Sequence, residues 1–135
     1  MSAQTTQPFH ARESSSARLT ATVKDESETP IPGASLGTLT LMLYDQRTEL
    51  ASPGSTAAII NGRNRQNVLN ANGCTIDGSG NMVMIFSPAD NVIVNPTLAR
   101  KSERHVALFE YTYAAGLKAG KEEVLIDVFN LSRTT

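Results

Sequence analysis

The sequence contains no tryptophan, one cysteine and only two histidines among its 135 residues. A single cysteine cannot form an intramolecular disulfide, and it excludes the cysteine-rich zinc sites of small domains. The two histidines, His10 and His105, offer few ligands for a histidine-based metal centre. The formal net charge is −1, whereas nucleic-acid-binding proteins usually carry a basic balance or stripe. We therefore expect no metal, no cofactor and no nucleic-acid partner.

Long apolar runs are absent as well. No stretch of 18 apolar residues is present, so we expect no membrane-spanning helix, and residues 1–16 lack the apolar core of a secretory signal. The lone Cys74 fits synthesis in a reducing cytoplasm. A chain of this length fits one domain, which buries roughly 68% of its unfolded surface and needs neither metal nor disulfide to fold.

Residues 1–16 are polar, small and without a repeating pattern. One interpretation is a disordered tail, because such a segment buries too little apolar surface to offset the entropy of ordering it. The other is an extended arm that becomes ordered on a neighbouring subunit, with Phe9 as its anchor. We favour the arm, and we expect the folded domain over residues 17–131 and a short tail over 132–135.

Apolar and polar residues alternate in several short segments, which is the period of a half-buried β-strand. The clearest segment is 38–44, in which Leu39, Leu41 and Leu43 share one face. Prolines, glycines and Asn-Gly or Asp-Gly pairs separate the segments, and Asp45 begins a polar turn. The pattern predicts an antiparallel β-sandwich of six to eight short strands. The expected strands are 17–24, 38–44, 74–76, 81–86, 104–114 and 123–131, the last two joined by a loop over 115–120.

Two short segments favour helical turns instead. Residues 63–69 present Val68 and Leu69 as the buried side of a short helix, and Ser87 followed by Pro88 provides an N-cap and a first helical position. Residues 48–60 predict an irregular loop and then a short edge strand. No 3.6-residue pattern supports a helix longer than about two turns.

The residues that commonly carry catalysis do not form a recognisable constellation. Cys74 is better interpreted as a buried core thiol than as a nucleophile. His105 begins a strand and shares a face with Phe109, so we expect an edge or interface histidine rather than a general base. The acidic residues of the loop after Val23 lack the spacing of a calcium loop. We expect that the protein is not an enzyme.

Basic residues occur in two short groups with neutral or acidic neighbours. Such neighbours are more typical of basic side chains exposed to solvent than of a row of phosphate-binding residues on a nucleic-acid-binding surface. The groups can instead pair with an acidic protein surface, so we treat them, together with Phe9, as candidate partner-binding residues. They are Arg63 and Arg65 in the first group and Arg100, Lys101 and Arg104 in the second.

The segment 81–86 is apolar on both faces, although a sandwich strand normally buries one face only. Either the loops cover its second face, or another subunit does. Both alternatives remain open at this point.

Three segments together resemble the opening of the small immunoglobulin-like virion proteins of tailed bacteriophages, including the start of the baseplate upper protein. They are Leu19–Asp25, Pro30–Ala34 and Leu39–Asp45. The closing segments 109–113 and 124–128 look like the final hairpin of such domains. The resemblance extends over about residues 17–131 and implies an all-β, immunoglobulin-like sandwich with one or two short helical inserts. The region 61–95 is longer than a minimal domain needs, which leaves the strand order open.

The resemblance also implies a role. It is that of a non-catalytic structural protein of a virion, made in the host cytoplasm. Within that role we expect a head decoration (cement) protein that binds the major capsid protein or other virion subunits through its N-terminal arm and loops, as a homo-oligomer on the particle. A neck or tail protein of the same fold is the alternative. A carbohydrate-binding module for host recognition is a further alternative; it needs exposed aromatic rings, and the available tyrosines are Tyr44, Tyr111 and Tyr113.

Overall fold

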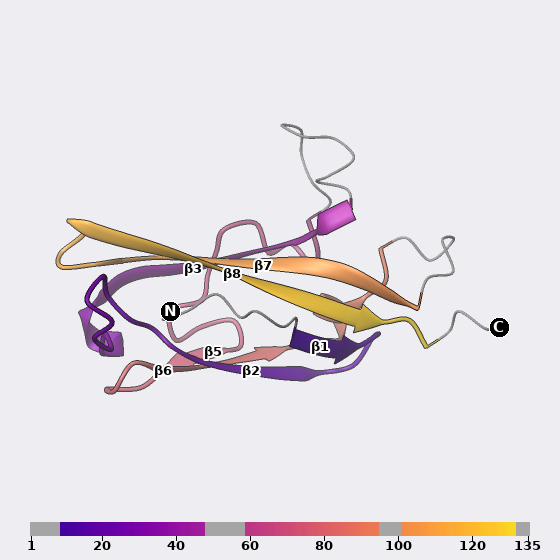
Figure 1. Ribbon diagram of the computed structural model, residues 1–135, viewed down its shortest axis with the longest axis horizontal. Helices are drawn as coiled ribbons and strands as arrows, with labels where there is room; N and C mark the ends of the chain where they lie inside the picture. Colours follow the sequence, from indigo (N-terminus) through magenta and orange to yellow (C-terminus); the bar gives the residue numbers. More distant parts are fainter. Residues whose placement is uncertain (1–8, 48–58, 95–100, 132–135) are drawn as a thin grey trace.

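The computed structural model describes residues 9–47, 59–94 and 101–131. Within these ranges there are eight β-strands and two 3-10 helices, η1 (Gly33–Ser35) and η2 (Pro88–Asn91), which lie in the connections. The strands form two sheets that pack on each other (Figure 1). The predicted all-β sandwich with short helical inserts is confirmed. The strands are β1 (Phe9–Arg12), β2 (Ala17–Thr22), β3 (Leu36–Asp45), β4 (Gln66–Asn67), β5 (Cys74–Ile76), β6 (Asn81–Phe86), β7 (Ser102–Tyr113) and β8 (Lys118–Phe129).

The strand order is that of an immunoglobulin-like sandwich. One sheet has the order β1-β8-β7-β3-β4 and the other has the order β2-β6-β5. In the lettering of immunoglobulin domains, β2, β6 and β5 correspond to B, E and D, and β3, β7 and β8 to C, F and G. Every described pairing is antiparallel except that of β1, which runs parallel to β8. Among the described residues, no strand takes the place of strand A beside β2.

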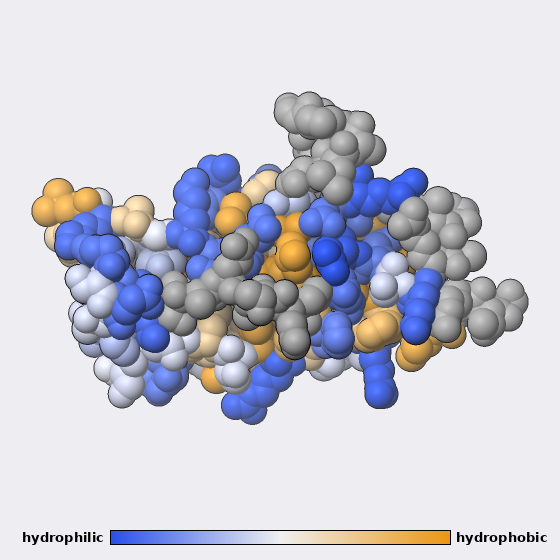
Figure 2. Space-filling model, in the orientation of Figure 1, coloured by the Kyte–Doolittle hydropathy of each residue, from blue (hydrophilic) through white to orange (hydrophobic). Residues whose placement is uncertain are grey.

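The core lies between the two sheets and is formed by every second residue of each strand. Leu39, Leu41 and Leu43 of β3 are almost completely buried, as the alternation predicts. From the opposite sheet, Met82, Met84 and Phe86 of β6 face them and are fully buried. In Figure 2, hydrophilic residues cover most of the visible face, and hydrophobic residues show between them.

The hairpin of β7 and β8 is the longest feature of the fold, with a register that runs from Ser102↔Phe129 to Tyr113↔Lys118. The predicted hairpin is confirmed, but β8 begins at Lys118, inside the expected loop 115–120. The strands extend further because the turn is tight. Ala114, Ala115 and Gly116 adopt positive φ angles of 54°, 57° and 83°, which reverse the chain in few residues.

The predicted short helix over residues 63–69 is wrong. Gln66 and Asn67 form β4 on the edge of β3, and the backbone N–H of Val68 donates to the carbonyl of Leu39. Val68 is fully buried, but on an extended backbone. Arg65 just before β4 has a positive φ of 53°, which an α-helix cannot contain, and the edge of β3 supplies the hydrogen-bond partners that a helix would otherwise provide.

The predicted boundary between arm and domain also changes. Residues 9–12 form β1, whose Ala11 is buried, so the described half of the expected arm belongs to the domain. The edge of β8 offers main-chain partners, and these allow a polar segment to be ordered despite its composition. Residues 1–8 and 132–135 lie outside the described residues, as does most of the expected loop 48–60.

Candidate functional site

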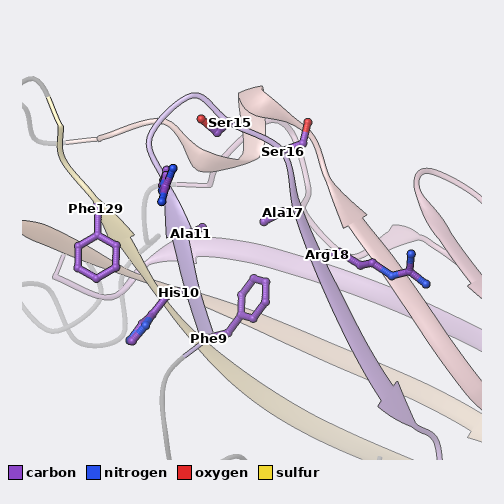
Figure 3. A pocket seen from close by; sticks show the side chains of 9 residues that line it. Phe9, His10, Ala11, Ser15, Ser16, Ala17, Arg18 and Phe129 are labelled. Atoms are coloured by element: carbon purple, nitrogen blue, oxygen red, sulfur yellow. The ribbon is translucent and has the colours of Figure 1, made fainter.

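The sandwich is open along one side, between the edge strands β1 and β2 of its two sheets. A groove of about 580 Å³ lies there (Figure 3), and we call it the β1–β2 groove. Both strands and the turn between them contribute to it, together with Phe129 of β8. Its lining residues are Phe9, His10, Ala11, Arg12, Ser15, Ser16, Ala17, Arg18 and Phe129.

The groove has an apolar wall, and its lining residues also include two arginines, Arg12 and Arg18. Phe9 is only half-buried; its ring lies 6.2 Å from the ring of Phe86 in the core. His10 packs edge-on against Phe129, with 5.3 Å between ring centroids. Arg18 is exposed and points away from the hollow in Figure 3. Because the lining residues include no carboxylate, the groove suits an uncharged or acidic chain segment.

The outer edge of β2 adds main-chain groups to this surface. Among the described strands, β2 pairs only with β6, so its other edge has no strand beside it. An edge strand presents a row of backbone N–H and C=O groups that can pair with another chain. The groove and the edge together can therefore bind an extended segment through its backbone as well as its side chains.

For the outer face of β6, the sequence left two alternatives open, cover by loops or by another subunit. Ile85 is 43% exposed and Val83 is half-buried, so the second apolar face of this strand is only partly covered within the chain. Its cross-strand neighbours on the same face include Thr20 of β2 and Thr75 of β5, opposite Val83. This face is a second, smaller candidate contact surface.

Arg63, a predicted partner-binding residue, instead lies inside the fold. Its Nε donates to Asp90 Oδ1 over 2.5 Å and its Nη2 to Asp90 Oδ2 over 3.0 Å, and both residues are buried. Asn61 Nδ2 and the backbone N–H of Ser87 also donate to this carboxylate. Burial by itself raises the pKa of Asp90, but these hydrogen bonds and the Arg63 charge outweigh it and lower the pKa.

The other predicted basic residues are not gathered into one patch. Arg65 is exposed and lies 3.9 Å from a carboxylate oxygen of Glu110. Arg104 is ion-paired with Asp127 across the β7–β8 ladder at 2.8 Å. Lys101 is exposed, and Arg100 lies outside the described residues. Of the five predicted partner-binding residues that the structure describes, Phe9 alone lines the β1–β2 groove.

The sequence analysis missed a buried polar cluster at one end of the larger sheet. Asp45, Glu103 and His105 are buried, and one ligand atom from each lies within 4.8 Å of the other two. Oxygen and nitrogen donors of this kind suit a divalent cation. However, Glu103 Oε1 already lies 2.7 Å from His105 Nε2 and accepts the backbone N–H of Val94 at 2.6 Å. We therefore interpret the cluster as an internal network that closes this end of the sheet.

The signal for this cluster is present in the alternation of the strands. Asp45 continues the inward face of Leu41 and Leu43, and Glu103 stands two residues before His105 on its face. The polar character of Asp45 suggested a turn, although its position in the alternation indicated burial.

The described residues contain no helix that is long and apolar enough to cross a membrane. Comparisons with protein-family models, with curated proteins and with solved structures found no match.

Proposed function

We propose that this chain is a non-catalytic structural subunit of a tailed-bacteriophage virion, and specifically a head decoration (cement) protein made in the host cytoplasm. The observation that supports the proposal is the β1–β2 groove. At this groove the core is incompletely covered, and the N-terminal strand lies at its rim. Its partners are the major capsid protein or other virion subunits, including further copies of the chain.

The groove suits this role because a cement protein must fold first and bind its neighbours afterwards. The described residues contain a sheet edge without a paired strand and a half-covered apolar wall, and residues 1–8 precede β1 in the sequence. Ordering such a segment on assembly adds contact area at an entropy cost. Repetition over many copies of a shell multiplies the effect of a weak single contact.

The carbohydrate-binding alternative gains no support from the described tyrosines. Stacking on a sugar requires an exposed ring face. Tyr44 and Tyr111 are buried, and the Tyr111 hydroxyl donates to the carbonyl of Lys24. The Tyr113 hydroxyl donates to Glu26 Oε1. A neck or tail protein of the same fold stays the nearer alternative, and copy number separates it from a decoration protein.

The deciding experiment is the copy number of this protein in purified particles, measured by quantitative mass spectrometry against the major capsid protein. We expect a simple ratio to the capsid protein, because a decoration protein follows the lattice of the shell. A copy number equal to that of a portal ring or tail component would assign the protein to the neck or tail. Absence from the particles would overturn the virion role.

A binding assay examines the surface involved. Because β1 belongs to the domain, the informative deletion is residues 1–8 rather than 1–16. We expect the shortened chain to keep its fold and to lose attachment to particles that lack the protein. Removal of residues 132–135 is the matched control and should leave attachment unchanged. Equal attachment of both shortened chains would exclude the N-terminal segment from the contact.

A further inference from the structure

Among the described residues, no strand lies beside the outer edge of β2. We propose that residues 1–8 of a neighbouring copy add to the edge of β2 as an antiparallel strand in the β1–β2 groove, and that two copies exchange these segments reciprocally. This inference deepens the proposed function by naming the contact that the N-terminal segment makes, but its test needs no virion.

The first argument is the comparison of the described sheet edges. Natural proteins protect edge strands by shortness, by proline, by lysine or by covering them. Strands β1, β4 and β5, with four, two and three residues, are short. Strand β2 has six residues and contains neither proline nor lysine. The outer edge of β8 is longer, because β1 pairs only with its last four residues, but the open part carries Lys118 and Lys121. Strand β2 is therefore the least protected edge in the described part of the chain.

The second argument is the incomplete burial beside that edge. A sheet with five strands packs against one with three, so the smaller sheet does not cover all of the larger one. Phe9, Ala17 and Ala21 pack against the core but are only partly buried. One added strand beside β2 lies opposite β1 and covers these side chains. Each square ångström of apolar surface removed from water contributes about 25 cal/mol.

The third argument concerns the length and place of the donor segment. Eight extended residues span at most about 26–29 Å, and a six-residue strand such as β2 is about 20 Å long. Residues 2–7 carry no charged side chain, and Pro8, which lacks an N–H, ends the pairing. The segment is long enough to pair along all of β2 and retain a short connection to β1.

The position of Phe9 explains why the exchange is reciprocal. Phe9 packs on Phe86, and Phe86 is the cross-strand partner of Ala17, the first residue of β2. The donor segment therefore departs from the same opening that contains the acceptor edge. Two copies that face each other at this opening fill both grooves in one closed, two-fold contact. Exchange of an identical element in this way is an inexpensive route to a dimer.

The test is a photo-crosslink between isotopically distinct copies of the full chain. The Thr5→Cys variant, which contains ¹⁴N, is modified with a benzophenone maleimide. It is mixed with an equal amount of the unaltered chain, which contains ¹⁵N and no benzophenone. Cys74 does not interfere, because it is 2% exposed and burial raises the pKa of its thiol to about 11. After illumination, trypsin releases residues 19–24 of β2 as one peptide, and mass spectrometry shows which copy it came from.

We expect the ¹⁴N benzophenone to crosslink to the ¹⁵N peptide 19–24. The matched control is Arg65→Cys, at an exposed position just before β4 on the opposite edge of the larger sheet from β1, from which crosslinks to β2 should be absent. Gln4→Pro combined with Thr6→Pro removes two N–H donors from the segment and leaves the described domain untouched. This variant should lose the crosslink and run as a monomer in analytical ultracentrifugation.

Crosslinks confined to the ¹⁴N copy would show that each segment docks on its own domain, and this result would overturn the exchange. Crosslinks that map away from β2, or that persist in the double-proline variant, would also overturn it. Since the purified chain is used, exchange without incorporation into particles would contradict only the virion role. Incorporation without exchange would contradict only this inference.

Discussion

The ring of Phe9 lies 6.2 Å from the ring of Phe86 and joins the N-terminal strand to the core of the sandwich. Phe86 is fully buried in β6, whereas Phe9 is only half-buried at the rim of the β1–β2 groove. This contact crosses from one sheet to the other, since β1 pairs with β8 and β6 belongs to the smaller sheet. It makes the N-terminal strand part of the domain and leaves the groove beside it open.

Phe9→Ala should therefore destabilise the isolated domain. The loss of a half-buried aromatic side chain from this contact costs about 1–3 kcal/mol of unfolding free energy. Urea denaturation measures this loss of unfolding free energy. The control is His10→Ala, on the outer side of the same strand, for which we expect the unfolding free energy to change by less than about 1 kcal/mol. An unchanged unfolding free energy in Phe9→Ala would show that β1 does not contribute to the stability of the fold.

The buried pair of Arg63 and Asp90 should be the most sensitive charged site in the described chain. Removal of one partner leaves the other as an uncompensated buried charge, which costs about 3–5 kcal/mol. We expect this loss for Asp90→Ala and for Arg63→Ala in chemical denaturation. Arg65→Ala is the control, because its exposed pair with Glu110 contributes at most about 1 kcal/mol. Similar losses for Arg63→Ala and Arg65→Ala would contradict the buried pair.

The lowered pKa of Asp90 predicts how the stability of the fold depends on pH. Burial opposes ionisation of Asp90, but its hydrogen bonds from Arg63, Asn61 and Ser87 lower the pKa below the ordinary value of 3.8. A carboxyl group whose pKa is lower in the folded protein than in the unfolded chain stabilises the fold at pH values above the unfolded-chain pKa. This contribution is lost as the pH falls through the pKa of the folded protein.

Asp90→Asn should remove this part of the acid dependence. Urea midpoints measured from pH 6 down to pH 2 should fall less steeply below about pH 4 in the variant than in the unaltered chain. Parallel curves for the two proteins would show that Asp90 has no lowered pKa in the folded state.

Gly120 is required by the ring of its cross-strand partner, Tyr111. A Cβ atom at residue 120 would lie 2.4 Å from Tyr111 Cζ. The ring cannot easily move away, because it is buried and its hydroxyl donates to the carbonyl of Lys24. Gly120→Ala should cost about 1–3 kcal/mol through overpacking.

The control for this variant is Gly78→Ala. Nothing lies within 4 Å of a Cβ atom at residue 78, so alanine fits there and restricts the unfolded chain slightly. Thermal unfolding should separate the two variants clearly. Equal melting temperatures for Gly120→Ala and Gly78→Ala would contradict the packing of Tyr111 on Gly120.

The sequence by itself determined six of the eight described strands, all except β1 and β4, and the apolar residues that they turn inward. The alternation of Leu39, Leu41 and Leu43, and that of the β7–β8 hairpin, is a local property with a period of two residues, and one register buries all of the apolar set. The turns were readable for the same reason. Asn61 and Asn72 lie in Asn-Gly pairs and adopt positive φ angles of 54° and 53°, as the local preference of asparagine predicts.

Only the tertiary structure decided what the polar residues do. The residues next to Arg63 in the sequence suggest a surface position, because they are mostly polar. Its burial depends on Asp90, which lies 27 residues further along the chain. Asp45 is buried beside His105, its partner across the β3–β7 ladder, and a local pattern of charge cannot contain that pairing. Phe9 and residues 10–12 are ordered by the distant edge of β8. The edge of β2, on which the further inference depends, follows from the pairing of distant strands in the order β2-β6-β5, in which no other described strand lies beside β2.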